Sequence, residues 1–454
     1  MSGLRVLVVG ASIAGPATAY WLARAGAHVT VIERAKSLRT NGQAVDIRSV
    51  GVNAMRKIPG MEAAVRAKTV PIEGINFVGP SGHSYATIKR TGDPDQQSLV
   101  SEYEILRGNL SRVLFDLTRD EDRIKYVFGE QVALITPQEV QRGVGDTMES
   151  ENSEPRPVTV KFENGNPTAE YDLVVACDGA HSKTRTLGLG SEAGARKHIH
   201  STNCWAAYFT LKNDLLVGTS NSNMGHAYSA PGGRWAAIGP APNGGGNLAA
   251  FMRYSPASDE GEKAMAPFRE ASSNGTDALK EYISATYRGA GWKVDDIVNG
   301  MMDADDFHAT EIIQVHLPRF HAGRNFALVG DAGYAGAAGA GTSLALVGAY
   351  VLAGEIKRAG VGHGGDLATA LNAYSERMRP IVDDLQQTPP ILSTVMAPQT
   401  AWGIRVRNAI FGFLSWSGVI GFAHRWLGGV FEKPGRVELP DYGLDEGRSG
   451  GKRV

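Results

Sequence analysis

The sequence predicts an α/β protein in which a unit built on parallel strands is interleaved with a unit built on an antiparallel β-sheet, with a helix near the C-terminus. Two strand-and-glycine segments, 8–16 and 326–341, lie far apart in the chain, and a third strand between them ends at Asp178. Short alternating strands separated by Gly, Pro and Asn turns fill residues 190–300. We assign 1–75, 100–190 and 300–388 to the first unit, 76–99 and 191–299 to the second, 389–440 to a bridging helical segment, and 441–454 to a tail.

Length, net charge and cysteine content limit the classes of protein to which the chain can belong. The chain of 454 residues exceeds one simple hydrophobic core, which favours two domains. The formal net charge is -1, so we expect neither a nucleic-acid partner nor a general attraction to anionic membranes. Cys177 and Cys204 are the only cysteines and lack metal-ligand spacing, so we expect no metal site and a reducing compartment, the cytoplasm. A monomer and a homodimer are both compatible with these features.

The first glycine segment lies in a strand, turn, helix and strand pattern that ends in an acid. The apolar run Leu4–Val9 predicts a buried parallel strand, and Ile13–Gly26 predicts a helix that ends at its glycine. A second strand, Val29–Ile32, follows and leads into Glu33. This order is typical of a Rossmann-like dinucleotide-binding unit.

Each part of this unit has a physical task in binding a dinucleotide. Gly10 permits the tight turn, and Gly15 permits close packing of the helix on the strand. The helix start at Ile13–Ala14 directs free N–H groups toward a pyrophosphate, and Glu33 is placed to accept a ribose hydroxyl. Ser12 occupies the position of the middle glycine, where it narrows the approach of the backbone to phosphate.

The second glycine segment predicts the other end of a long ligand. Asn325–Val329 predicts a strand, Gly330 and Asp331 its C-terminal turn, and Thr342–Lys357 a long helix. Asp331 can accept a hydroxyl from a polyol chain. The helix start at Gly341–Ser343 can stabilise negative charge on a bound ring. Together with the first segment, this arrangement predicts one FAD laid across the parallel-strand unit.

The motifs, in this order, resemble those of the class A flavoprotein monooxygenases, the aromatic-hydroxylase type, and within it the branch of tetracycline-modifying and secondary-metabolite enzymes. The resemblance covers most of the chain. The motifs that carry it are Gly10–Pro16 with Val31–Arg34, Gln43–Arg48, Glu104–Leu110, Cys177–Ser182 with Arg185, and Gly330–Asp331 with Gly341–Tyr350.

The resemblance implies an FAD- and NAD(P)H-dependent monooxygenase. NAD(P)H would bind transiently and reduce FAD, O2 would add at the flavin C4a position, and the hydroperoxide would hydroxylate or epoxidise an aromatic or polycyclic substrate. Arg48 would lie near the flavin, where it is a candidate catalytic residue. The residues implied to bind FAD are Gly10, Ser12, Ile13, Ala14, Gly15, Glu33, Arg34, Arg48, Arg107, Asp178, Asp331, Gly341, Thr342 and Ser343.

One departure keeps two other functions open. The family usually has a proline in the loop after its Gly-Asp pair, and residues 334–338 contain none. A looser pocket keeps open an FAD-dependent oxidase or reductase on the same fold. A non-catalytic flavin-fold binding protein is the third possibility, although the acids and arginines of the motifs oppose it.

The antiparallel unit predicts a pocket for a flat apolar substrate. Because side chains alternate along a strand, about half of its aromatic residues would face that pocket. His226 is a candidate catalytic residue, and His181 and Arg253 are polar candidates for a substrate or flavin contact. The candidate pocket residues are Trp205, Tyr208, Phe209, Tyr228, Trp235, Phe251 and Met252.

The apolar C-terminal stretch predicts a helix that bridges the two units. Its core, Ala409–His424, is shorter than the roughly 20 residues that span a bilayer. Two alternatives are a lid over the substrate entrance and a membrane-surface contact through Arg405, Arg407 and Arg425.

Overall fold

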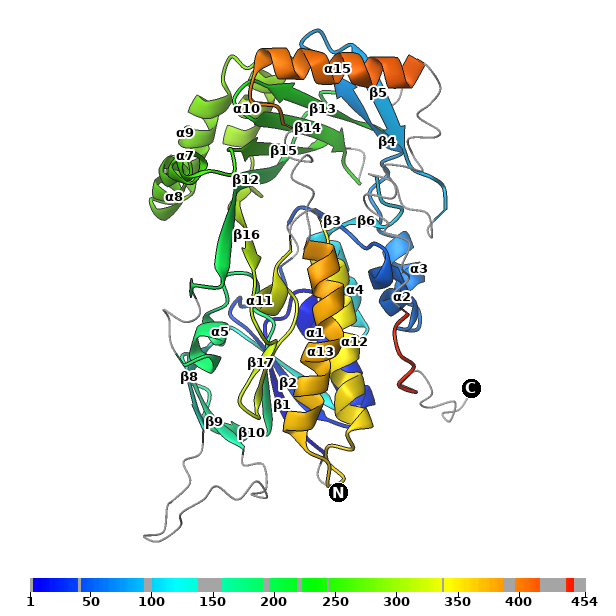
Figure 1. Ribbon diagram of the computed structural model, residues 1–454, viewed down its shortest axis with the longest axis vertical. Helices are drawn as coiled ribbons and strands as arrows, with labels where there is room; N and C mark the ends of the chain where they lie inside the picture. Colours follow the sequence, from blue (N-terminus) through cyan, green and yellow to red (C-terminus); the bar gives the residue numbers. More distant parts are fainter. Residues whose placement is uncertain are drawn as a thin grey trace.

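The protein consists of two units stacked along its long axis, with a six-stranded sheet in one and a seven-stranded sheet in the other (Figure 1). The predicted α/β fold is confirmed. The computed structural model describes residues 3–39, 42–93, 100–137, 157–190, 196–218, 223–242, 245–336, 339–386, 397–416 and 438–444.

The six-stranded sheet is the frame of the first unit and has the order β17-β18-β11-β1-β2-β7. Its strands pair in parallel except for β17 with β18. Four successive residues of β1 and all four of β11 are buried, as the apolar runs predict for strands covered on both faces. The strands are β1 (Arg5–Val9), β2 (His28–Glu33), β7 (Ile124–Phe128), β11 (Leu173–Ala176), β17 (His321–Ala322) and β18 (Phe326–Leu328).

A central helix, α12, is buried along nearly all of its length and packs against α1, α2 and α13. Small residues permit this close packing. A Cβ at Gly348 would lie 1.8 Å from the Tyr334 hydroxyl, and one at Gly330 would meet Ala14 and Ala345. The helices of this unit are α1 (Ala14–Arg24), α2 (Val50–Arg56), α3 (Met61–Arg66), α4 (Arg107–Asp116), α5 (Lys183–Gly188), α11 (Asp331–Tyr334), α12 (Gly341–Arg358) and α13 (Leu367–Gln386).

Two small sheets complete this part of the molecule. One has the order β10-β9-β8, and the other is the two-stranded antiparallel ribbon β3–β6. The ribbon lies between the two large sheets (Figure 1). Their bounds are β3 (Ala44–Asp46), β6 (Glu104–Leu106), β8 (Val132–Pro137), β9 (Val158–Phe162) and β10 (Ala169–Tyr171).

The seven-stranded sheet has the order β16-β12-β15-β14-β13-β4-β5 and is antiparallel except between β13 and β4. Most of β4 lies in 76–99, which we assigned to the second unit. β16 lies in 300–388, which we assigned to the first unit, although it pairs in this sheet. We therefore propose to move residues 308–315 to the second unit. The strands are β4 (Gly74–Val78), β5 (Ser84–Lys89), β12 (Ile199–Leu211), β13 (Met224–Ala230), β14 (Arg234–Pro240), β15 (Asn247–Tyr254) and β16 (His308–Val315).

Helices cover one face of this sheet. Trp205 stacks on Phe268 with ring centroids 5.1 Å apart, and Phe251 packs on Tyr287 at 4.1 Å. These contacts form a second core, separate from that around α12. The covering helices are α7 (Asp259–Lys263), α8 (Ala266–Ser273), α9 (Thr276–Tyr287) and α10 (Val294–Met302).

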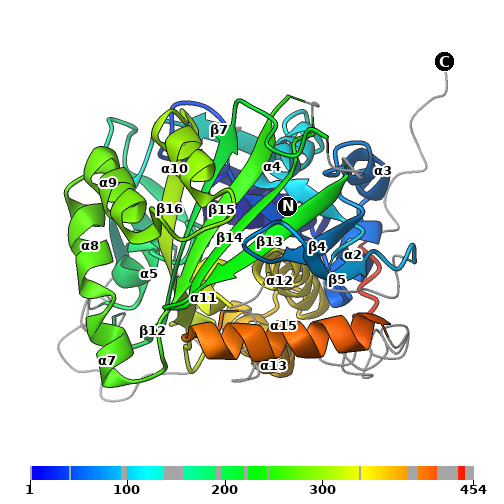
Figure 2. The same ribbon diagram turned by 90° about the horizontal axis from the view of Figure 1, so that it is seen from above.

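The C-terminal helix α15 (Ala401–Trp416) packs on β5 and β13, at the far end from the six-stranded sheet (Figures 1 and 2). Phe411 meets Phe77 at 5.3 Å between ring centroids, and Arg407 donates to Ser229 Oγ at 2.9 Å. These contacts lie on the seven-stranded sheet. Residues 417–424 of the predicted helix lie outside the described residues, so a bridge formed by the segment 389–440 stays a prediction. Arg407 is buried and so faces no membrane surface, and Arg425 lies outside the described residues.

No helix in the described ranges is long and apolar enough to cross a membrane.

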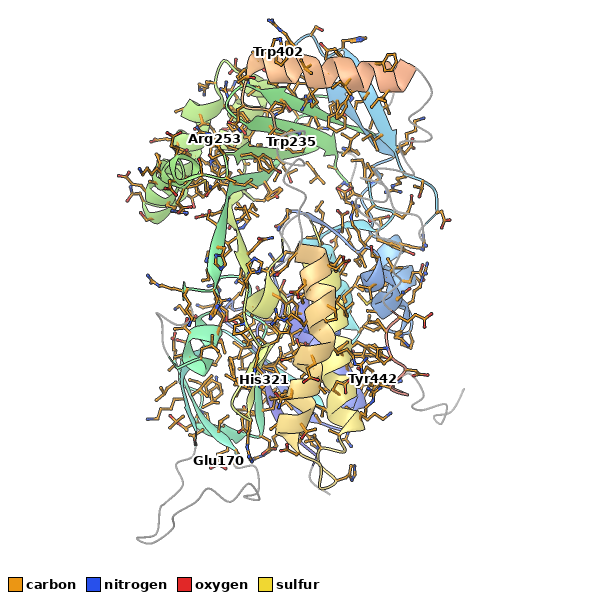
Figure 3. The ribbon with its side chains drawn as sticks, viewed as in Figure 1. Glu170, Trp235, Arg253, His321, Trp402 and Tyr442 are labelled. Carbon is orange, nitrogen blue, oxygen red and sulfur yellow. The ribbon has the colours of Figure 1, made fainter. Side chains whose placement is uncertain are left out.

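The segment 438–444 returns to the first unit, where Tyr442 lies beside α12 (Figure 3). Its hydroxyl donates to Glu355, a buried carboxylate that also accepts from Arg358 at 3.1 Å and Arg377 at 2.8 Å. Glu355 therefore joins α12, α13 and the C-terminal segment.

Replacing Glu355 by Gln should lower the free energy of unfolding by about 2 kcal/mol, because three donors lose a shared anionic acceptor. Urea unfolding followed by circular dichroism measures the change. The matched control is Glu376→Gln, an exposed acid on α13, which should stay within about 0.5 kcal/mol of the wild type. Equal changes in the free energy of unfolding for the two substitutions would show that Glu355 does not hold α12, α13 and the C-terminal segment together.

Candidate functional site

The glycine turn after β1 is fixed by steric contacts that exclude side chains. Gly10 has φ +107°, and its N–H donates to the Ile32 carbonyl at 2.8 Å. A Cβ at Gly10 would lie 2.6 Å from the Cys177 carbonyl oxygen, and one at Gly15 would lie 1.8 Å from the Gly10 oxygen. The ends of β1 and β11 and the start of α1 therefore meet at this turn. No side chain caps α1, so its first-turn N–H groups remain available to an anion.

Glu33 ties the end of β2 to this turn. Its carboxylate accepts from the N–H of Ala11 and from the N–H of Ala35, both at 3.0 Å, and lies 3.4 Å from Arg39. A carboxylate can accept about four hydrogen bonds, which leaves capacity for ribose hydroxyls. Arg34, which follows, is exposed.

The Ser12 hydroxyl contacts an arginine side chain, a contact that a glycine could not make. Arg107, the first residue of α4, lies with its Nε 3.3 Å from Ser12 Oγ, and Ser111 on the same helix donates to the Ser12 carbonyl at 3.1 Å. The substitution in the glycine pattern therefore anchors α4 beside the turn. This places the Arg107 guanidinium next to the phosphate position implied by the motif.

At the opposite end of the site, Asp331 follows Gly330, which has φ +68°. The Asp331 carboxylate accepts no hydrogen bond from any residue that the structure describes, and burial raises its pKa, an effect that the charge of Arg107 opposes. A Cβ at Gly341 would lie 3.0 Å from Asp331 Oδ1, so the carboxylate faces the start of α12. Asp331 is half-buried, and a carboxylate without a donor at such a position is suited to a ligand hydroxyl.

The loop after β3 is clamped onto the first turn of α12. Ser343 Oγ accepts from the Arg48 N–H at 2.9 Å and donates to the Arg48 carbonyl at 3.0 Å. The Arg48 guanidinium pairs with Asp46 at 3.0 Å. Thr342 is buried beside this contact, and no side chain caps the helix. Arg48, Gly341, Thr342 and Ser343 are thus brought together as predicted for a flavin-ring site.

The Asp178 carboxylate is engaged within its own loop. Its carboxylate accepts from Ser182 Oγ, from the Thr184 N–H at 3.1 Å and from Thr184 Oγ1 at 2.8 Å, and so it shapes the turn into α5. The buried Arg185 then donates to the carbonyls of Ala332 and Ala180, both at 2.9 Å. These bonds join the loops after β11 and β18. A direct contact between Asp178 and a cofactor stays a prediction.

The loop that lacks the family's proline is held by other means. The Ala335 carbonyl accepts from the Val315 N–H at 3.1 Å and from Gln386 Nε2 at 2.9 Å. The Tyr334 hydroxyl is 3.0 Å from that of Tyr374. Residues 337–338 lie outside the described ranges.

A cavity of about 240 Å³ lies between the seven-stranded sheet and the β3–β6 ribbon. Strand alternation divides the predicted aromatic residues between the two faces of the sheet. Tyr208, Trp235 and the predicted pocket residue Met252 have side chains on the cavity face, whereas Trp205, Phe209, Tyr228 and Phe251 belong to the core under α8–α10. The ribbon side is formed by 42–44, Glu104 and Leu106.

The candidate histidines and Arg253 do not converge in this cavity. His226 borders it, but the ring stacks on Trp292 at 6.4 Å and Nε2 lies 3.3 Å from Asn76 Nδ2, on the helix-covered face. Burial and Lys293 lower its pKa. Arg253 donates to the Tyr282 hydroxyl at 3.3 Å on that same face, and Figure 3 shows it beside Trp235 in the upper sheet. His181 is exposed.

Glu104 is the cavity residue that the sequence did not single out. In the sequence it is only the first residue of the motif Glu104–Leu110, and its position opposite Asp46 depends on a ribbon that the sequence does not reveal. Its carboxyl lines the cavity. No part of the chain that the structure describes groups three or more potential metal ligands.

The groups along the site complement an FAD molecule. Glu33 and Asp331 offer acceptors for hydroxyls at the two ends, and the uncapped starts of α1 and α12 offer N–H groups to phosphate and ring. The half-buried Asp331 carboxylate, which has no donor among the described residues, is the observation that fits a ligand most specifically.

Comparison with known proteins also indicates that the chain binds FAD. A family model described as FAD binding domain matches residues 3–388. The FAD-dependent monooxygenase asL4 of Sarocladium schorii is 30% identical over 462 residues, covering 97% of this chain and 99% of that protein. Monooxygenase CTB7 of Cercospora beticola is 30% identical over 456 residues, covering 98% and 99%. The solved structure of tetracycline destructase Tet(55) has a TM-score of 0.70 at 27% identity, covering 97% of this chain and 99% of that one.

Replacing Gly15 by Ala should destabilise the protein by about 3 kcal/mol and release FAD, because the new methyl group overlaps the Gly10 carbonyl. Thermal unfolding and the flavin content after gel filtration measure both effects. Gly245→Ala is the matched control, since an added Cβ there meets nothing within 4 Å. A Gly15→Ala protein that keeps its flavin and stability would contradict the steric reasoning.

Replacing Asp331 by Ala should weaken FAD binding by about tenfold or more, because a ligand hydroxyl loses a charged acceptor. Titration of apoprotein with FAD, followed by quenching of flavin fluorescence, gives the dissociation constant. Asp303→Ala, an exposed acid after α10, should leave it unchanged. Unchanged affinity in Asp331→Ala would remove this residue from the site.

Proposed function

Because this chain belongs to the FAD-binding-domain family and is a flavin-dependent monooxygenase, we propose that it uses NAD(P)H and O2 to insert one oxygen atom into an aromatic or polycyclic small molecule. The insertion is a hydroxylation or an epoxidation, and the product belongs to secondary metabolism. The relatives support this proposal by their names, which are those of monooxygenases and of a tetracycline destructase.

The observation that carries the proposal is the position of the cavity beside the flavin residues. The ribbon residue Gln43 lines the cavity, and its carbonyl accepts from the Arg107 N–H at 2.9 Å. At the opposite wall, removal from water and then the positive charge of Arg107 lower the pKa of His308. A substrate in the cavity and a flavin near Arg107 would therefore be neighbours.

FAD supplies the oxygen-transfer chemistry when bound, and the chain supplies position and water exclusion. Glu33, Arg107 and Asp331 would hold the cofactor along its length. The apolar cavity walls exclude water from the reacting atoms, and Trp235 offers a flat surface to an aromatic substrate.

The proposed use of NAD(P)H is transient. The sequence has no second strand–helix unit with a G-x-G-x-x-G pattern, which supports binding at a surface without a dedicated domain. Cys177 and Cys204 are buried and unpaired, which supports the cytoplasm as the proposed compartment.

The C-terminal helix is better suited to a lid than to a bridge. Trp235 forms part of the cavity wall and also packs against the cluster of Phe77, Ala227 and Phe411, the last of which belongs to α15. We propose that α15 borders the entrance to the substrate cavity.

Product formation should depend on both coenzyme and substrate. The flavin-loaded protein is incubated with NADPH or NADH and a panel of naphthalenediols, anthraquinones and tetracycline, while O2 use, H2O2 and product mass are recorded. The proposal predicts a product heavier by one oxygen atom and H2O2 well below O2 consumed for at least one compound. Full conversion of O2 to H2O2 with every compound would instead identify an oxidase or reductase. Absence of any O2 use would favour a binding protein.

A further inference from the structure

Glu104 places a half-buried carboxyl group beside aliphatic residues of the cavity wall. It is the first residue of β6, where Ile105 is fully buried in the core and Leu106 lines the cavity beside Glu104. In the part of the chain that the structure describes, the Glu104 side chain has no hydrogen bond and no ion pair within 4 Å. Neighbouring cavity walls are aliphatic: Val70, Ile72, Ile75 and Leu248.

A second carboxylate lies directly across the ribbon. The β3–β6 register pairs Asp46 with Glu104, and side chains directly opposite each other lie about 5 Å apart at Cβ. Asp46 Oδ2 accepts from Arg48 at 3.0 Å. Asp46 Oδ1 is buried and has no partner among the described residues. A second carboxylate this close disfavours ionisation of Glu104.

The nearby cations are committed to other groups. Arg48 pairs with Asp46, and Arg90 donates to the Val70 carbonyl at 3.0 Å and lies 3.9 Å from Glu102. An unpaired buried carboxyl group is more stable in its neutral form. Burial first, and then Asp46, raise the pKa of Glu104 to about 8, against the opposing charges of Arg48 and Arg90.

The remaining polar groups around the cavity are uncharged or already engaged. Asp306 accepts twice from Thr210, at 2.9 Å and 2.6 Å. Burial raises the pKa of Tyr208 to about 12 and lowers that of His308. His226 borders the cavity with its ring directed to Trp292. The cavity therefore suits an uncharged ligand, with Glu104 as its one unengaged acid among the described residues.

We propose, on the basis of the function proposed above, that Glu104 binds substrate in its neutral form by donating a hydrogen bond to a carbonyl oxygen. The ligand class is a flat, uncharged aromatic ketone, quinone or lactone. No proton leaves the pair during binding, so substrate and protein keep their charges.

The experiment uses the flavin-loaded full chain and equilibrium dialysis between pH 6.5 and 9.5. The probe is 1-tetralone, which has one carbonyl and no group that titrates in this range, and tetralin is the same skeleton without the oxygen. Wild-type affinity for 1-tetralone should fall about tenfold from pH 7 to pH 9, because ionised Glu104 no longer donates. Affinity for tetralin should not change with pH.

Three variants separate a ligand contact from a structural role. Glu104→Gln keeps a donor at every pH, so it should bind 1-tetralone as the wild type does at pH 7 and show no fall at pH 9. Glu104→Leu should weaken 1-tetralone at pH 7 by about tenfold and leave tetralin unaffected. Glu73→Gln, an exposed acid outside the cavity wall, should reproduce the wild-type profile.

Any of three results overturns the proposal: wild-type affinity for 1-tetralone that is flat with pH, the same fall in Glu104→Gln, or no preference of 1-tetralone over tetralin at pH 7. Flavin absorbance and NADPH-driven O2 use are recorded on the same samples. Retained flavin and substrate-stimulated O2 use with a flat profile would leave the monooxygenase function intact and remove the role of Glu104. Loss of both flavin and O2 use would count against the function itself, whatever the binding profile.

Discussion

The whole arrangement depends on the close approach of backbone segments at three glycines. Gly10, Gly15 and Gly330 stand where β1, β11 and β18 end and where α1 and α12 meet, and an added Cβ at each would approach a neighbouring atom to between 1.8 and 3.0 Å. Because side chains are excluded there, two uncapped helix starts lie at the same edge of the sheet. The side chains of Arg185 and Glu33 then fix the loops around that edge through hydrogen bonds to backbone groups.

The ribbon β3–β6 connects this edge of the sheet to the cavity. One end of it is clamped to α12 through Arg48 and Ser343, and the other leads into Arg107 and hence to Ser12. Its cavity side carries Glu104 opposite Asp46. A short two-stranded element thus contacts both α12 and the glycine turn and forms one wall of the cavity that we propose for the substrate.

Local patterns were enough to predict the parallel-strand unit. Arg5 to Glu33 forms one continuous strand–helix–strand, and Gly330 to the start of α12 is equally local, so periodicity and turn chemistry determine both. Features set by distant partners could not be predicted. The His226 ring lies on the helix-covered side of its strand, and α15 packs on the seven-stranded sheet. Glu104 and Asp46 meet only because a register pairs residues 58 positions apart.

The central claim is that this edge holds FAD in a form that a nicotinamide can reduce. The visible spectrum of the purified protein, recorded before and after anaerobic addition of NADPH, tests it most directly. Oxidised-flavin bands that bleach with NADPH and return on admission of air are the predicted result. A colourless protein that FAD cannot reconstitute would contradict the claim.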